Sequence, residues 1–175
     1  MAYITQVQYD YAPQEVKREF EEQIKKNGRI TNMKRTLLHS LPAYKALMEW
    51  YTLKDEVMPF LGERGVNFYC YAISTENDCL VCSTFFARIL QDMNINFDEI
   101  DFTEKEELII KYGRSLVRNP QEIPPEIFDD LKKHFNEEEI VALTAFGSMM
   151  IATNLINTAL KVELDDVLVP YAKRR

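Results

Sequence analysis

The stretch Ile140-Val-Ala-Leu-Thr-Ala-Phe-Gly-Ser-Met-Met-Ile-Ala-Thr-Asn-Leu-Ile-Asn-Thr-Ala-Leu160 contains no charged residue. It is long enough to cross a bilayer as a helix. It also carries hydroxyl and amide side chains, at Thr144, Ser148, Thr153, Asn154, Asn157 and Thr158. A lone helix in lipid could not satisfy these groups, and no second apolar span is available to pair with it. The stretch therefore predicts the central helix of a helical core, apolar on nearly every face and buried partly against another subunit.

The same helical period continues on the N-terminal side of this stretch. Apolar residues recur every three or four positions after each of a series of helix-start signals. These signals are Ala12-Pro13, Thr31, Pro42, Asn77-Asp78, the capping box of Thr103 with Glu106, and the capping box of Asn136 with Glu139, with a short helix carrying Ile127, Leu131 and Phe135 before the last of them. The aromatic-rich run 66–73 fits a strand by propensity, but we interpret it as helix because its surroundings are helical. We predict a compact all-α fold, with residues 1–175 forming one domain.

Composition restricts the classes of partner. The 175-residue chain has a formal net charge of -7, which disfavours nucleic acid or an anionic membrane surface as the main partner. The basic run Lys173-Arg-Arg175 is a short tail that we expect to be solvated. The N-terminus shows no secretory signal, and three cysteines do not make a secreted disulfide framework. We therefore expect a cytoplasmic protein with no bound cofactor.

Cys79 and Cys82 are the best candidates for chemistry. They are spaced C-x-x-C at the predicted start of a helix, so their sulfurs lie on adjacent parts of one face and can cycle between dithiol and disulfide. The unpaired N–H groups at a helix start stabilise a nearby thiolate, which predicts that Cys79 is the more acidic thiol. An apolar stripe through Cys82, Phe86, Ile89 and Met93 predicts that Cys82 faces inward.

Two other roles for this pair stay open. Cys82 can be a small core residue with Cys79 incidental, since free cysteine is often buried. A zinc site is the weakest alternative, because four ligands are needed and Cys70, His39 and His134 lack ligand spacing. We expect both histidines to be structural or solvated.

Three segments in order resemble the carboxymuconolactone decarboxylase family, and specifically its alkylhydroperoxidase D-like branch. They are Asn32-Met-Lys-Arg-Thr-Leu-Leu-His-Ser-Leu-Pro42, Ile73-Ser-Thr-Glu-Asn-Asp-Cys-Leu-Val-Cys82, and Phe135-Asn-Glu-Glu-Glu-Ile140 leading into Thr153-Asn-Leu-Ile-Asn157. The resemblance covers about residues 30–165 and implies an all-helical fold that assembles into trimers or hexamers. It also implies that Cys82 attacks a hydroperoxide, that Cys79 resolves the product as a disulfide, and that a thiol electron donor completes the cycle.

The sequence departs from this family at two positions. In its peroxidase members a glutamate twelve residues before the first cysteine and a histidine four after the second form a proton relay, and here Asn67 and Phe86 stand there. A phenyl group beside a buried sulfur raises its pKa. Glu63 and Glu76 are nearby in sequence but do not fall at the relay spacing.

Two functions follow from this reading. The first is a thiol-dependent peroxidase or disulfide oxidoreductase that uses Cys79 and Cys82. The second is a relay-less relative that binds a small apolar ligand or acts as an oligomeric scaffold. In this second hypothesis Phe85, Phe86, Phe68 and Tyr69 fill the space of the active site.

Overall fold

The computed structural model describes residues 2–172, which form α-helices and short 3-10 helices and contain no strand. The all-α prediction is therefore confirmed for this range, whereas the predicted solvation of the tail at residues 173–175 concerns residues outside it. The α-helices are α1 (Gln14–Asn27), α2 (Asn32–Leu37), α3 (Leu41–Met48), α4 (Trp50–Glu76), α5 (Leu80–Asp92), α6 (Glu104–Arg118), α7 (Pro125–His134) and α8 (Glu137–Ala159), and the 3-10 helices are Tyr9–Tyr11, Pro120–Glu122 and Asp166–Tyr171.

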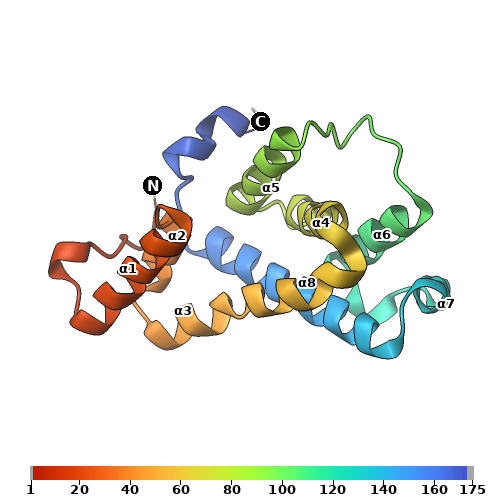
Figure 1. The fold of residues 1–175 in the computed structure, drawn as a ribbon, viewed down its shortest axis with the longest axis horizontal. Helices are drawn as coiled ribbons and strands as arrows, with labels where there is room; N and C mark the ends of the chain where they lie inside the picture. Colours follow the sequence, from red (N-terminus) through yellow and green to blue (C-terminus); the bar gives the residue numbers. More distant parts are fainter. Residues whose placement is uncertain (1, 173–175) are drawn as a thin grey trace.

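Helix α8, which contains most of the uncharged stretch, runs through the middle of the molecule (Figure 1). It packs against α3, α4, α5, α6 and α7. Among the described residues it is the one helix that is long and apolar enough to cross a membrane. The Thr144, Ser148 and Thr153 hydroxyls donate to carbonyls one turn earlier in the same helix, and Asn154 accepts from Ser74 on α4. The packing of α8 against five other helices agrees with the predicted central helix of the core.

Most of the predicted helix starts are confirmed. The Thr31 side chain caps α2, and both predicted capping boxes are present, at Thr103 for α6 and at Asn136 for α8. Gly28 ends α1 in the left-handed conformation, at φ 71°. The prediction that Asn77-Asp78 caps the next helix is wrong. Asn77 closes α4 and Asp78 has φ 51°, so Cys79 itself takes the N-cap position of α5.

Helix α4 carries both the predicted helical run 66–73 and a kink. The run is helical, which confirms that interpretation over the strand alternative. Gly62 interrupts the helix with φ 69° and ψ 168°, a backbone conformation that residues with a Cβ rarely adopt. Pro59, inside the first half, removes one backbone donor just before the break. The second half of α4 is thereby redirected against α6 and α8.

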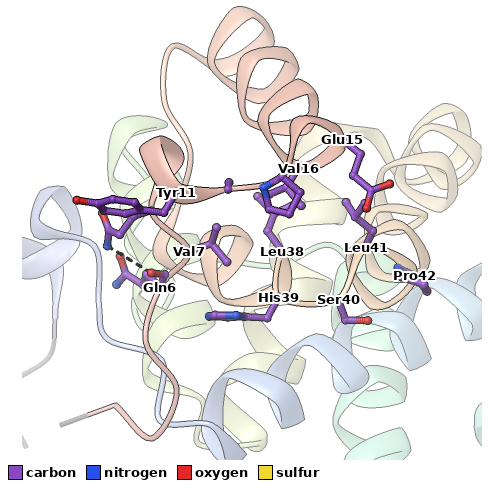
Figure 2. Close-up of a pocket in the computed structure, with 13 residues that line it drawn as sticks. Gln6, Val7, Tyr11, Glu15, Val16, Leu38, His39, Ser40, Leu41 and Pro42 are labelled. Carbon is purple, nitrogen blue, oxygen red and sulfur yellow. Dashed lines mark hydrogen bonds between the residues drawn. The ribbon is translucent and has the colours of Figure 1, made fainter.

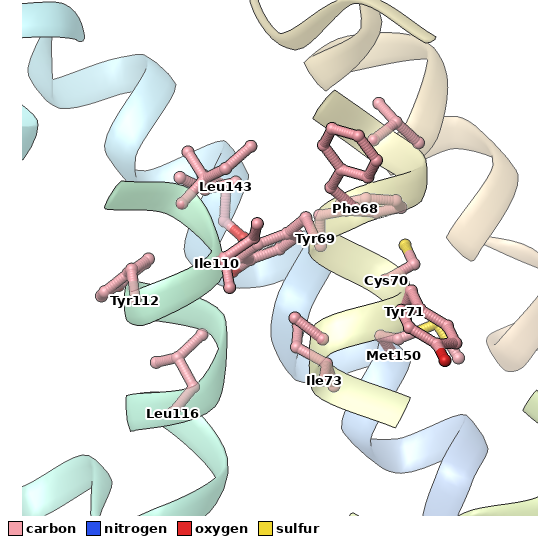
Figure 3. Close-up of a cluster of buried hydrophobic side chains, with 14 of the residues drawn as sticks. Phe68, Tyr69, Cys70, Tyr71, Ile73, Ile110, Tyr112, Leu116, Leu143 and Met150 are labelled. Carbon is pink, nitrogen blue, oxygen red and sulfur yellow. The ribbon is translucent and has the colours of Figure 1, made fainter. Parts of the chain in front are cut away.

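Two groups of buried side chains flank α8. The larger one joins α4, α5, α6, α7 and α8, and Figure 3 shows Tyr69 and Ile73 of α4 on the side that faces α6. The smaller one joins α1, α2 and α3 to the later turns of α8 through Met149, Ala152 and Ile156. Met33 of α2 packs against both groups. The region around Met33 is therefore the seam between the N-terminal helices and the rest of the fold.

Candidate functional site

The cysteine pair lies at the junction of α4, α5 and α8. Cys79 and Cys82 are 1% and 5% exposed, and the Cys79 backbone N–H donates to the Ser74 carbonyl at 3.0 Å. Asn157 of α8 donates through Nδ2 to the Cys82 sulfur at 3.2 Å and to the Met33 sulfur at 3.3 Å. The inward orientation predicted for Cys82 is confirmed. All three cysteines are free thiols, so the pair stands in its dithiol state.

The two thiols have opposite pKa shifts. A hydrogen bond from Cys82 lowers the pKa of Cys79 to about 7, although burial acts against it. Thr158 and the backbone N–H groups of Cys82 and Val81 lower this pKa further. The same hydrogen bond and burial raise the pKa of Cys82 well above its usual value, while the Asn157 amide acts in the opposite direction. These directions agree with the prediction that Cys79 is the more acidic thiol; the Cys82 thiol is the largest cause, and backbone N–H groups of the helix start contribute as well.

This arrangement predicts how the thiolate titrates. In the unmodified protein we expect thiolate absorbance in the ultraviolet to rise with a midpoint near pH 7, because Cys79 loses its proton there. Cys82→Ala removes the donor that stabilises this thiolate, so the midpoint should move upward. Cys70→Ala is the control and should leave the midpoint in place, since burial holds the pKa of Cys70 far higher. An unchanged midpoint in Cys82→Ala would assign the effect to the helix start instead.

A cavity of about 170 Å³ opens beside Cys82. Its wall includes Cys82, Asn67 and Phe86, so the structure brings the two departures from the family relay next to the thiol. Asn67 is held by its own helix, since its amide donates to the Glu63 carbonyl at 2.9 Å. Phe86 packs against Trp50 with ring centroids 6.5 Å apart. The cavity therefore has an aromatic side chain where the relay would have its base.

Neither of the nearby glutamates replaces that relay. The side chain of Glu76 is occupied by Arg118, with Nε and Oε1 2.5 Å apart, and Arg114 approaches it as well. Glu63 is exposed, and neither glutamate lines the cavity. The one carboxylate in the wall is Asp165, which accepts the Asn32 backbone N–H at 2.9 Å and whose pKa is raised by burial.

The idea that four aromatic residues fill the active-site space is wrong for two of them. Phe85 and Phe86 line the cavity, but Phe68 packs against Phe97 and Phe102 in the core, and Tyr69 donates its hydroxyl to the Leu143 carbonyl of α8. Phe68 and Tyr69 directly follow Asn67, which lines the cavity. Successive residues of a helix point in different directions, so closeness in sequence does not place them in the same wall. Phe68 and Tyr69 therefore do not fill the cavity beside Cys82.

Sequence reasoning missed several residues of the cavity wall. Lys34, Trp50 and Asp165 come from α2, the start of α4 and the segment after α8. Asn157 belongs to a segment that carried the family resemblance, but no role was inferred for it. Only Asn157 gave a signal in the sequence, as an amide inside an uncharged helix. The others could not be found without knowing how α2 and the C-terminal segment pack.

The histidines and a second hollow lie apart from the thiols. This hollow, about 630 Å³, is bordered by residues 6–16 and 38–42, and Figure 2 shows His39 at its edge. His39 Nε2 bonds to the Thr5 carbonyl at 2.7 Å, which supports the expected structural role. His134 ends α7 and contacts Phe135. Within residues 2–172 no group of three or more His, Cys, Asp or Glu residues is placed to hold a metal ion.

Solved structures share this fold, although no protein-family model and no curated protein matches the chain. An uncharacterized peroxidase-related protein from Ralstonia eutropha JMP134, described as an alkylhydroperoxidase AhpD core, superposes with a TM-score of 0.78 at 17% identity, covering 95% of this chain and 94% of that one. A peroxidase-related protein from Silicibacter sp. TM1040 gives 0.77 at 16% identity, over 91% and 89%. The debrominase Bmp8 gives 0.73 at 18% identity, over 96% and 95%. The chain thus has the alkylhydroperoxidase D-like fold, and the resemblance is confirmed at that level.

Proposed function

We propose that this protein is a thiol-dependent oxidoreductase that reduces a small organic hydroperoxide through Cys79 and Cys82. The observation that carries the proposal is a hydrogen-bonded pair in which one thiol has a pKa near 7 and the other faces a cavity beside it. Fold neighbours described as peroxidase-related support the same class of chemistry.

In the first step the two cysteines carry out the proton transfer for which the family uses its glutamate and histidine relay. The Cys79 thiolate accepts the Cys82 proton along the hydrogen bond that joins the two sulfurs. The Asn157 amide, 3.2 Å from the Cys82 sulfur, stabilises the thiolate that results. Because the pKa of Cys82 lies well above that of Cys79, this transfer is uphill and the reactive form is scarce. The expected reaction is slow compared with one assisted by a relay.

The second step consumes the peroxide. The Cys82 thiolate attacks the terminal oxygen of the hydroperoxide, the one that carries hydrogen, so that an S–O bond forms and the O–O bond breaks. The alkoxide takes the proton held by Cys79 and leaves as an alcohol, while Cys82 becomes a sulfenic acid. The Cys79 thiolate then attacks this sulfur and closes the disulfide, and the released hydroxide takes a proton from solvent. The peroxide is reduced by two electrons that the dithiol supplies, and an external thiol restores the pair.

One peroxide assay tests this function. With tert-butyl hydroperoxide and dithiothreitol as electron donor, we expect turnover by the unmodified protein and only the uncatalysed rate with Cys79→Ser/Cys82→Ser. Cys70→Ser is the control and should keep the rate, since Cys70 is fully buried in the core. Peptide mass spectrometry should show a Cys79–Cys82 disulfide with Cys70 still a thiol. A main bridge that contains Cys70, or equal rates in the double variant, would contradict the proposal.

The cavity also favours a second candidate function. With Asn67 and Phe86 in its wall it has no acid and base of the family kind, which suits a protein that binds a small ligand or serves as a scaffold without turnover.

Self-association is part of either proposal. Large apolar side chains of Leu80, Val141 and Leu155 are 44%, 67% and 65% exposed, which supports partial burial against a second copy. A cytoplasmic location is likewise proposed, because free thiols persist in a reducing compartment.

A further inference from the structure

Lys34 of α2 is a buried cation in the wall of the cavity beside Cys82. The residue is 5% exposed. Its ammonium group donates to Gln23 Oε1 at 2.5 Å and to Tyr51 Oη at 3.0 Å. Both partners are neutral, and an ammonium group has three N–H donors. The ammonium group also lies over the Tyr51 ring, 4.8 Å from its centroid. One donor is left over, and among the described residues no carboxylate pairs with Lys34.

Other polar groups of the wall are also unpaired. Asn157 is 2% exposed, and its side-chain oxygen has no hydrogen-bond partner. The indole N–H of Trp50 is buried and has none either. Buried polar groups in folded proteins are normally paired. Both unpaired atoms have almost no accessible surface, so a ligand in the cavity would reach them only after a small movement of the wall. Both residues line the cavity that contains Lys34.

The charges of the wall favour an anion. Lys34 and Lys54 contribute two ammonium groups, and Asp165 contributes the one carboxylate. Asp165 is already engaged by the Asn32 N–H and is further influenced by Arg29 and Arg35. Lys54 lies over the Trp50 ring, 5.9 Å from its centroid. Lys34 lies over the Tyr51 ring in the same way, but its charge is buried and has no carboxylate partner among the described residues, so a carboxylate ligand would neutralise it.

The size and the remaining lining define the rest of the ligand. About 170 Å³ is slightly more than the roughly 150 Å³ apolar cavity that holds benzene in other proteins. Trp50, Phe85 and Phe86 supply aromatic surface. We propose that this cavity binds a carboxylate on a compact apolar body of about one aromatic ring, with the carboxylate oxygen on the Lys34 ammonium group. This inference rests on the proposed function in one respect: it takes the bound ligand to be the organic part of the hydroperoxide substrate.

Trp50 is the single tryptophan of the chain and lies in the cavity wall, so its fluorescence reports binding directly. The probes are benzoate and its uncharged isostere benzamide, titrated into the reduced protein without peroxide. We expect benzoate to bind at least about tenfold more tightly than benzamide, because one charge-assisted hydrogen bond in a buried site contributes that much. Equal binding of the two probes, or no binding of benzoate, would overturn the inference.

Variants then assign the selectivity to Lys34. Lys34→Met keeps the length of the side chain and removes its charge, so the preference for benzoate should fall to within about twofold. Lys34→Arg should keep the preference. Lys45→Met is the matched surface control, since that side chain is 66% exposed on α3, and it should change nothing. Circular dichroism checks folding, and a folded Lys34→Met protein that still prefers benzoate would show that Lys34 only ties α1 to α4.

The outcome separates this inference from the proposed function. Selective benzoate binding without peroxide turnover would retain the anion site and contradict the oxidoreductase proposal. Turnover of tert-butyl hydroperoxide without benzoate selectivity would do the reverse. The comparison of the two probes in the unmodified chain needs no variant, so it decides the question even where Lys34→Met fails to fold.

Discussion

The double variant Asn67→Glu/Phe86→His should reduce tert-butyl hydroperoxide about 10² to 10⁴ times faster than the unmodified protein, the usual contribution of general-base assistance. Phe86 lies one helical turn after Cys82 on α5, so an imidazole there is within reach of the thiol proton. Asn67 lines the same cavity from α4, and a carboxylate at that position can orient the ring and stabilise its charged form. The measurement is the initial rate with dithiothreitol as donor.

The reason for this large effect is the present state of Cys82. Its pKa is raised well above the usual value by the hydrogen bond to Cys79 and by burial, and only the Asn157 amide acts against them. A base beside the thiol would remove its proton without the uphill transfer to Cys79. The thiolate is the nucleophile in thiol chemistry, so the rate should follow its population.

Packing is the risk in this experiment, because Phe86 is 3% exposed and contacts Trp50 and Phe85. Replacing a buried phenyl group can cost several kcal/mol, so thermal unfolding must be followed with the rate. Asn67→Gln/Phe86→Leu is the matched control, which disturbs the same packing without supplying an acid or a base. A well-folded relay variant with the rate of the parent protein would refute the relay explanation and favour the ligand-binding function.

The helices were predictable because their signals are local. Capping side chains at Thr31, Thr103 and Asn136 act within one turn, and the confirmed helix starts follow from them. The start of α5 was misplaced because Asn77 and Asp78 carry capping residue types, yet the chain uses them for the turn that closes α4. The kink at Gly62 depends on how the second half of α4 packs, which no local pattern specifies.

The candidate site was predictable only where one helix supplies it. The spacing of Cys79 and Cys82 places them together on α5 by helical geometry alone. The opposite pKa shifts of the two thiols depend on how closely the fold brings them together, which spacing alone does not give. Lys34 could not be foreseen, because it lines the same cavity as Cys82 only through the packing of α2 against the rest of the fold. Asn157 marks that meeting point, with Met33 and Cys82 both as partners.

Gly147→Ala should lower the free energy of unfolding by roughly 1–4 kcal/mol, although alanine is normally the better helix residue by about 1 kcal/mol. Gly147 lies on α8 beside Tyr69 of α4, and an added Cβ would overlap the Tyr69 hydroxyl and come within 2.9 Å of Leu116 Cδ1. Tyr69 is fully buried and its hydroxyl donates to the Leu143 carbonyl at 3.0 Å, so it cannot turn away without losing that bond. Overpacking and a lost buried hydrogen bond each cost about 1–3 kcal/mol. Denaturant unfolding measures the change.

Two further variants separate steric overlap from a general effect of alanine. Gly65→Ala is the matched control on α4, because its Cβ would meet its nearest atoms at 3.4 Å, an ordinary contact, and stability should stay level or rise by up to about 1 kcal/mol. Adding Tyr69→Phe to Gly147→Ala removes the overlapping oxygen and should recover part of the loss, so the two changes should not be additive. If Gly147→Ala is as stable as the parent, or if the double variant loses the sum of the two single effects, the close approach of α4 and α8 at Tyr69 does not determine how these helices pack.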